Sequence, residues 1–311
     1  MTQVGEREPN ESGLGLLAHG AASVTFVEEV RAVGPRGADD ARREYRAATA
    51  SLEMRDAAAA LDAAPLSRVE FTSELAGASV RQLRRRDGTF GRHYDGREAR
   101  ESLLAYVADP LDLGRLLPKE ATTLGGEWDV PLDALVTVLA PVAELGWRAP
   151  EEGTDLQLVR SFQQGLGGNV HLGFGGALAG QARGQVFELG VSGKERLATL
   201  RVTFELTLTA DHTDLARRRA LENEREQGVE VLAATSTRRL VGVVDLVWSV
   251  EGERPVSATV AADEAMAMSI RVQPEEGEAA TQTVEFAGRC ALSLTAAPVP
   301  LESSVAPRDG K

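Results

Sequence analysis

Histidine and cysteine are the residue types of this chain that could carry metal or nucleophilic chemistry. The four histidines lie far apart in the sequence: His19, His93, His171 and His212. No two of them have the spacing with which a helix presents histidines to zinc. The single cysteine, Cys290, excludes an intrachain disulfide and a cysteine-based metal site. The sequence therefore predicts no metal, no cofactor and no catalytic residue.

Two histidines have carboxylates as sequence neighbours. "HYDG" at 93–96 and "ADHTD" at 210–214 each place a His near an Asp, a combination that could serve a hydrolase as general base. Both stretches are also typical of turns, where such residues are solvated. Asp211 or Thr213 could instead cap a helix over 214–227. A hydrolase using His93 or His212 is therefore one hypothesis among several.

The stretch "GLGGNVHLGFGGALAG" at 165–180 holds seven glycines and invites comparison with nucleotide-binding loops. Dinucleotide binding needs glycines at i, i+2 and i+5, and here the third position is apolar. The P-loop pattern fails as well, because no Gly-Lys-Ser/Thr follows. Val170, Leu172 and Phe174 alternate with polar or glycine positions, which predicts a strand. Its glycines would face a neighbouring backbone or mark strong sheet curvature.

The charge of the chain argues against nucleic-acid binding. The net charge of the 311 residues is −13, whereas a protein that neutralises phosphates needs a basic face. Arginine greatly outnumbers lysine, which with the many alanines is typical of a GC-rich bacterial genome. No apolar run approaches the ~20 residues of a membrane helix, and the first residues lack a signal-peptide pattern. The compartment stays open: the chain is cytoplasmic, or it begins after a removed signal.

A local basic run, "RQLRRRDG" at 81–88 with Arg92 nearby, interrupts this acidic chain. We expect a hairpin turned at Asp87-Gly88, on which alternate arginines face water. Binding of an anion or an anionic partner is the alternative.

Alternation of apolar and polar residues predicts a mainly antiparallel β protein. It is clearest over 196–210, where every second residue from Leu200 to Leu208 is apolar, as in a strand with one wet face. The segment 21–33 predicts a strand whose inner face changes from apolar to acidic at Glu28.

Further strands and three helices follow from the same patterns. We expect a long hairpin over 238–273, turned near Glu251-Gly252 and continuing into a third strand, and a last strand over 281–296. The predicted helices cover 97–109, 132–145 and 213–227.

A boundary at 148–155 is the most evident division of the chain. It suggests a flexible lead, an N-terminal region of hairpins and a helix, an antiparallel meander with one charged helix, and a flexible tail. The corresponding ranges are 1–12, 13–150, 151–296 and 297–311, with one continuous domain over 13–296 as the alternative.

Four stretches carry a resemblance to a known group of proteins: "ARREYRAATASLEM", "ELAGASVRQLRRRDGTF", "DLGRLLPKEATTLGGEWDVPLDALVTVLAP" and "VGVVDLVWSVEGERPVSATV". Together they resemble a family of uncharacterised β-rich proteins of planctomycete-type bacteria, many with export or lipoprotein signals. The resemblance implies that Trp128 packs before a helix at 132–140 and that the setting is the periplasm or cell envelope. It supplies no catalytic motif. A looser likeness, of fold alone, is to curved-sheet envelope proteins that hold acyl chains.

These observations predict an α+β protein with a mainly antiparallel, curved sheet, half-barrel or sandwich-like, partly covered by a few helices. The leading function is a non-catalytic envelope module that binds an apolar ligand or a protein partner on the curved sheet. The alternatives are a structural or interaction protein without a small-molecule ligand, and the hydrolase. The candidate ligand-binding residues are Val170, Leu172, Phe174, Trp128 and Trp248, although tryptophans, Trp147 included, are also expected as core anchors.

Overall fold

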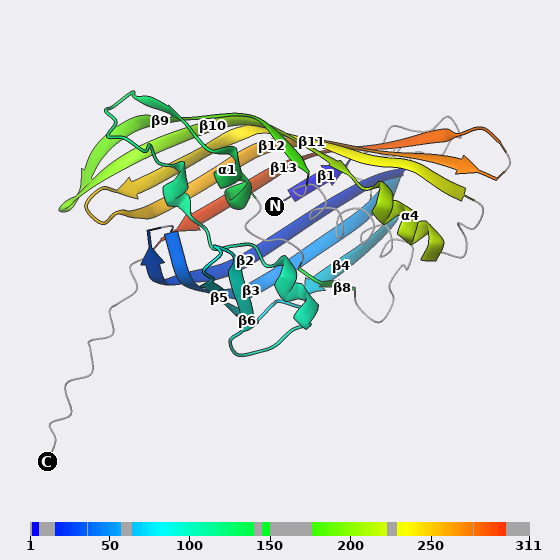
Figure 1. Ribbon diagram of the computed structural model, residues 1–311, viewed down its shortest axis with the longest axis horizontal. Coiled ribbons are helices and arrows are strands. Elements are labelled where there is room, and N and C mark those ends of the chain that lie inside the picture. Colours follow the sequence, from blue (N-terminus) through cyan, green and yellow to red (C-terminus); the bar gives the residue numbers. More distant parts are fainter. Residues whose placement is uncertain are drawn as a thin grey trace, which may run out of the picture.

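The computed structural model describes residues 2–5, 16–35, 37–56, 64–139, 145–149, 176–222, 229–275 and 277–296. In this part of the chain, thirteen strands form one sheet (Figure 1). In the N-terminal half they are β1 (Thr2–Gly5), β2 (Leu16–Gly34), β3 (Gly37–Asp56), β4 (Ser67–Ser73), β5 (Ser79–Arg84), β6 (Phe90–Tyr94), β7 (Glu127–Asp129) and β8 (Trp147–Arg148). In the C-terminal half they are β9 (Ala177–Ser192), β10 (Glu195–Asp211), β11 (Val229–Ser249), β12 (Arg254–Pro274) and β13 (Ala280–Thr295).

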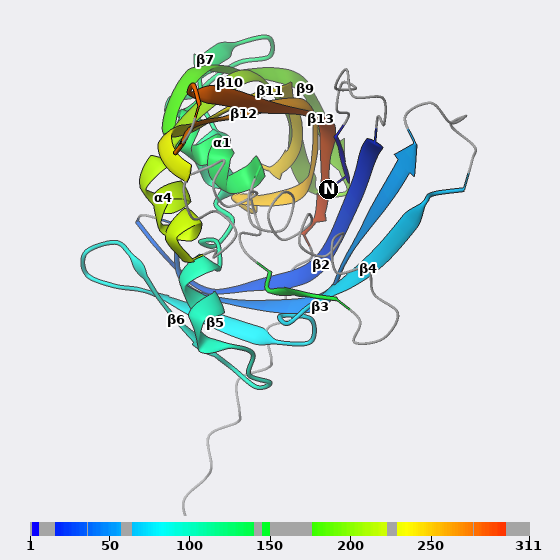
Figure 2. The ribbon, with the colours of Figure 1, turned by 90° about the vertical axis from the view of Figure 1, so that its right-hand side faces the viewer.

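The sheet is antiparallel throughout and curls into a half-barrel (Figure 2). Its strands run in the order β6-β5-β3-β2-β1-β13-β12-β11-β10-β9-β7, with β4 and β8 branching from β3. The predicted fold class is therefore confirmed as a curved antiparallel sheet with few helices. The strands predicted at 21–33, 196–210 and 281–296 are β2, β10 and β13.

Strand β10 shows why the sequence pattern specifies one face. Leu200, Val202, Phe204, Leu206 and Leu208 are all buried, and the residues between them are partly or fully exposed. We call the face that these buried residues share the inner face of the sheet. A one-residue shift would turn all five toward water, so this alternation fixes the register of β10.

The hairpin predicted near Glu251-Gly252 joins β11 to β12, and the one predicted at Asp87-Gly88 joins β5 to β6. One detail is corrected. No third strand starts before residue 273, because β12 continues unbroken to Pro274 and the next strand begins at Ala280. The segment 41–54 belongs to β3.

Strand β1 joins the two halves of the sheet. It pairs on one side with β2, Thr2 opposite Ala21, and on the other with β13, Thr2 opposite Arg289. Residues 2–5 of the expected flexible lead thus form a strand. Strands from both sides of the expected boundary at 148–155 belong to the same sheet.

Two of the three predicted helices are present in the described chain, and a short 3₁₀ helix stands in place of the third. Helix α1 (Leu132–Leu139) begins at the first residue of the predicted 132–145 helix, although Leu145 at the end of that range is not helical. Helix α4 (Thr213–Glu222) covers the described part of the predicted 213–227 helix. Over 97–109 the structure has only the 3₁₀ helix η1 (Glu101–Tyr106), and a second, η2 (Leu113–Leu116), follows. The backbone is extended at Arg100, before η1, and at Val107, after it, and Pro110 follows three residues later.

Two glycines in β9, Gly180 and Gly184, lie where neighbouring atoms come too close for a side chain. A Cβ at Gly180 would lie 2.1 Å from the carbonyl oxygen of Glu205 on β10, and one at Gly184 would lie 2.2 Å from the Trp128 ring. Glycine is therefore required at these two positions because a neighbouring strand and an indole ring pack closely against them. The predicted strand residues Val170, Leu172 and Phe174 lie outside the described residues.

Candidate functional site

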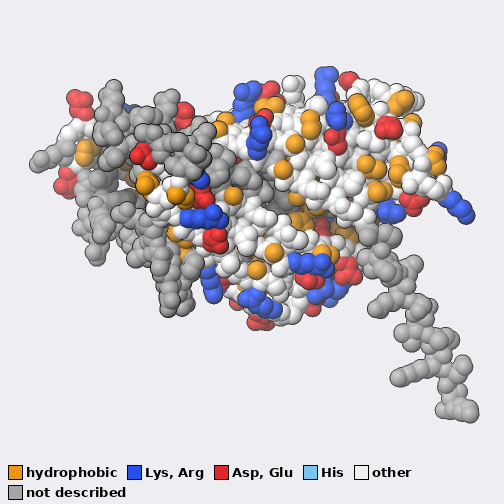
Figure 3. All heavy atoms as spheres, turned by 180° about the vertical axis from the view of Figure 1, so that it is seen from behind, with side chains coloured by type: hydrophobic (Ala, Val, Ile, Leu, Met, Phe, Trp, Pro, Cys, Tyr) orange, Lys and Arg blue, Asp and Glu red, His pale blue; other side chains and the backbone are white. Residues whose placement is uncertain are grey.

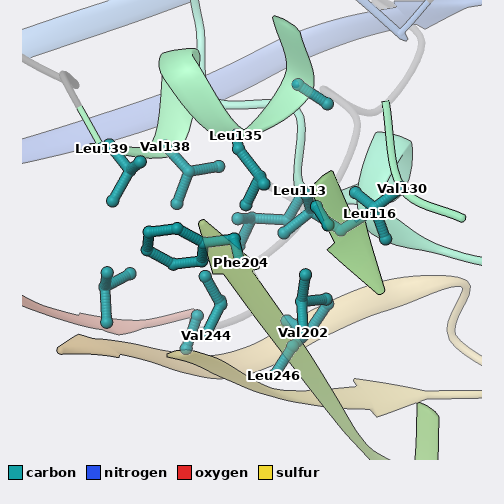
Figure 4. Close-up of a cluster of buried hydrophobic side chains, with 14 of the residues drawn as sticks. Leu113, Leu116, Val130, Leu135, Val138, Leu139, Val202, Phe204, Val244 and Leu246 are labelled. Carbon is teal, nitrogen blue, oxygen red and sulfur yellow. The ribbon is translucent and has the colours of Figure 1, made fainter. Parts of the chain in front are cut away.

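The inner face of the C-terminal half of the sheet is an apolar wall. Helix α1 lies against it within the curve (Figure 2). In Figure 4, Leu135, Val138 and Leu139 of α1 point toward Phe204 of β10 and Val244 of β11. All five side chains are at most 4 % exposed. The protein's own helix thus fills this part of the concave face.

Trp128 and Trp248, two of the candidate ligand-binding residues, both pack against this same cluster. The Trp128 Nε1 donates a hydrogen bond to the Leu116 carbonyl at 3.0 Å, which fixes the ring over Gly184. Trp147 packs against the apolar clusters of the N-terminal half. The expectation that the tryptophans anchor the core is confirmed. A contact of Trp128 or Trp248 with a ligand stays a prediction.

Within the described ranges, the buried apolar side chains form three clusters. One belongs to the C-terminal half with α1, and the other two to the N-terminal half, around Tyr45 and around Phe71. The pairing register carries the inner face from one half to the other through β1, since the following residues are successive partners: Leu52, Gly20, Gln3, Gly288 and Glu264. The two halves therefore present the same face toward the concavity.

Beyond Thr2 the two halves separate. From Ala22 onward β2 pairs only with β3, and from Cys290 onward β13 pairs only with β12, within the described part of the chain. Four apolar side chains lie on the inner face here and are only half-buried: Val24 and Phe26 of β2, Leu292 and Leu294 of β13. We call these four residues the inner seam. They are packed on one side and incompletely covered on the other.

Glu28 continues the inner face of β2 and explains why that face changes character midway. Its carboxylate accepts hydrogen bonds from Arg43 Nε at 2.8 Å and from the Leu111 backbone N–H at 2.8 Å. Arg43, fully buried, also donates to the carbonyls of Ala108 and Asp109 at 3.3 and 3.1 Å. This buried pair fastens the segment after η1 to the sheet.

A second buried ion pair lies in the wall of the C-terminal half. Arg238 Nε and Glu264 Oε1 are 2.6 Å apart, with the two side chains 2 % and 4 % exposed. Glu264 is the partner of Leu240 across β11 and β12, so the pair shares the inner face with the core. The sequence alone did not predict this pair. The pattern that could have revealed it is a charged residue, on each of the two strands, at a position where the alternation calls for an apolar side chain.

His212 anchors helix α4 to the wall. Its Nε2 lies 2.8 Å from the Ser236 hydroxyl of β11, and burial lowers the pKa of the imidazole, against the opposing effect of Asp211. The Asp211 carboxylate accepts from the Thr213 N–H at 2.8 Å and from its hydroxyl at 2.5 Å, which caps α4. The capping alternative for Asp211 is thus confirmed.

In the part of the chain that the structure describes, neither His212 nor His93 has the neighbours that a hydrolase would need. Asp211 is engaged at the helix cap rather than in orienting the His212 ring, and Ser236 is buried in the wall at 6 % exposure. His93 is exposed on β6, and its neighbour Asp95 pairs with Arg42 at 2.9 Å. Among the described residues, no group of three or more His, Cys, Asp or Glu could hold a metal ion.

The basic run is largely neutralised by carboxylates on neighbouring elements. Arg81 pairs with Asp40 at 2.7 Å, and its hydrogen bonds lower the pKa of that carboxyl. Arg84 pairs with Asp39 and lies over the Phe90 ring. Arg92 also has a carboxylate partner, Asp109. Basic and acidic side chains are similarly interspersed on the face in Figure 3.

A groove of about 990 Å³ crosses the outer face of β9 to β13. Its floor is made of small residues in register, among them Thr203, Ala261 and Ala291. Charged residues border it, and each has an ion-pair partner: Arg289 pairs with Asp263 at 3.2 Å, whereas Glu205 and Arg183 pair with residues outside the groove, Arg239 and Glu127. The charges that border the groove are therefore already paired, so the described residues that line it present no unpaired charge to attract an ionic ligand.

No protein-family model and no curated protein matches this chain. Of the helices in the described ranges, none has the length and apolar character needed to cross a membrane.

Proposed function

We propose that this protein is a non-catalytic binding module that receives an apolar ligand on the concave side of its sheet, at the inner seam. The observation that carries the proposal is the separation of β2 and β13 beyond β1, where half-buried apolar side chains border unpaired strand edges. An apolar molecule placed there would bury the surface that the four side chains of the inner seam leave exposed. Complete burial of an exposed side chain of this size contributes about 1.5–3 kcal/mol, and covering a half-buried one contributes a corresponding part of that.

The wall that α1 occupies is less suited to a ligand, because those side chains are already packed. The seam needs no such displacement. The resemblance to exported proteins favours a cell-envelope setting for this binding, and that setting is part of the proposal.

The first test is to extract the purified protein with organic solvent and to compare native and denaturing mass spectra. A co-purifying apolar molecule is the expected result. The second test is titration with the uncharged fluorophore N-phenyl-1-naphthylamine, whose emission rises in apolar sites.

Two variants make that titration specific. Val24→Gln places an amide in the seam and should weaken probe binding about tenfold, equivalent to about 1.4 kcal/mol. Val27→Gln changes the same residue type on the same strand, but Val27 is 40 % exposed and partners Glu44 on the opposite face. Equal binding by both variants and the unaltered protein would reject the seam as the site.

A protein-interaction module without a small ligand is the second candidate. The exposed apolar edge of β9, with Phe187, Leu189 and Val191 between 56 and 72 % exposed, favours it. If no molecule co-purifies and the probe does not bind, the protein-interaction module is the favoured function.

A further inference from the structure

The β9–β10 hairpin has a free edge, which lies at the left of Figure 1. On the side of β9 away from β10, β7 pairs with Arg183–Gln185, and the backbone of Gly125 and Gly126 pairs with Val186. From Phe187 to Ser192 no strand of the described chain pairs with this side. Unpaired backbone N–H and C=O groups along such an edge form a template for another strand.

The side chains along this edge are unusually apolar for exposed positions. Phe187, Leu189 and Val191 are 56, 56 and 72 % exposed. Natural edge strands commonly carry charges, proline or bulges that prevent pairing. Here a bulge lies at Phe187, between the pairs Thr199–Glu188 and Leu200–Val186, and the strand continues unprotected beyond it.

The geometry of the hairpin sets which groups are available. Ser192 and Glu195 close a two-residue turn, with Gly193 at φ +63°. The closing pair of such a turn is hydrogen-bonded, and hydrogen-bonded pairs alternate along an antiparallel ladder. Leu189 and Val191 therefore direct their N–H and C=O groups toward the free edge.

We propose that this edge pairs with the same edge of a second copy of the chain, antiparallel and about a twofold axis at Gly190. In this register Leu189 of each copy lies opposite Val191 of the other, so the groups directed outward meet. Nothing lies within 4 Å of a Cβ at Gly190, which leaves room for close approach at the axis. Phe187 comes opposite the turn, so the pairing ends where β7 and its loop begin.

Charge favours a second copy as the occupant. The chain as a whole carries −13 and repels itself, but the pairing segment has one acid, Glu188, and one base, Lys194. In the proposed register Glu188 of one copy is diagonal to Lys194 of the other, within reach of a cross-strand attraction. The interaction occurs twice because of the twofold axis.

The experiment is sedimentation velocity of the full chain over a range of protein concentrations. We expect a monomer–dimer equilibrium. The double change Leu189→Lys and Val191→Lys, which sets lysines against each other, should weaken dimerisation at least about tenfold. Val33→Lys is the matched control, since Val33 is 75 % exposed on β2, and it should leave the equilibrium unchanged.

Disulfide trapping tests the register. At a non-hydrogen-bonded pair the two Cα atoms lie about 4.5 Å apart, within the range of a disulfide, so Gly190→Cys should cross-link under mild oxidation. Ser192→Cys, two residues from the axis, should not, and the unaltered chain controls for Cys290. A monomer at every concentration, an equal effect of Val33→Lys, or equal cross-linking at 190 and 192 would each overturn the proposal.

Discussion

At the scale of single residues, the two buried arginines of the described chain, Arg43 and Arg238, each form an ion pair with a glutamate. Arg43 is fully buried and satisfies Glu28 together with two backbone carbonyls. A buried ion pair of this kind adds little to the free energy of unfolding compared with apolar residues of similar size. Loss of one partner, however, leaves the other charge buried and uncompensated. The arrangement specifies where the segment after η1 docks.

Arg43→Met should lower the free energy of unfolding by about 3–5 kcal/mol, because Glu28 would remain buried without its cation. Arg31→Met is the control. Arg31 pairs with Glu29 at 3.1 Å, but both side chains are 35 % exposed, so its loss should cost about 0–1 kcal/mol. Urea denaturation measures both, and similar losses would contradict the assigned role of Arg43.

His212 should make stability fall as the pH is lowered. Burial lowers its pKa in the folded state, whereas the unfolded imidazole titrates near its usual value of about 6.5. Below that value the unfolded chain binds more protons, so stability is lost as pH falls through the folded pKa. His212→Gln should remove this step from melting temperatures measured between about pH 7 and 5. His93→Gln is the control: His93 is exposed, and its replacement should leave the step in place.

At the scale of elements, small residues decide how closely β9 meets its neighbours. Gly184 lies under the Trp128 ring, whereas Gly190, in the same strand, has open space where a Cβ would stand. The same residue type thus has a packing role at one position and none at the other within this chain.

Gly184→Ala should destabilise the protein by about 1–3 kcal/mol, because the added methyl group overpacks against the indole. Gly190→Ala should be neutral or stabilise by up to about 1 kcal/mol, since glycine inside a strand is entropically unfavourable. Thermal denaturation gives both values, and tryptophan emission should shift only for Gly184→Ala. Equal effects would show that Trp128 does not pack on Gly184.

At the scale of the whole molecule, the short strand β1 makes one sheet of two halves. It is hydrogen-bonded to β2 and to β13, and beyond it these strands have no common neighbour in the described chain. The concavity and the inner seam depend on this link, because the link sets how the halves face each other.

Gln3→Pro should weaken that link. Proline removes a backbone donor and is confined to edges and bulges in sheets, whereas Gln3 pairs with both Gly20 and Gly288. We expect a lower melting temperature and a broader or split transition in calorimetry, as the halves unfold less cooperatively. Thr295→Pro, near the end of β13 and paired only with Ser257, should have a smaller effect. A single transition as sharp as that of the unaltered chain would contradict the linking role of β1.

The sequence by itself determined the strands and which face of each is buried, because side-chain alternation along a strand is a local property. The alternation of β10, the hairpin turns at 87–88 and 251–252, and the change of character at Glu28 all follow from residues close in sequence. Only the tertiary structure decided the strand order, the linking role of β1 and the pairing of Arg238 with Glu264. These depend on which distant segments become neighbours, and many pairings satisfy the same local pattern. Gly180 is intermediate: the sequence predicts that the glycines of 165–180 meet a neighbouring backbone or mark curvature, and the fold identifies the Glu205 backbone as the neighbour.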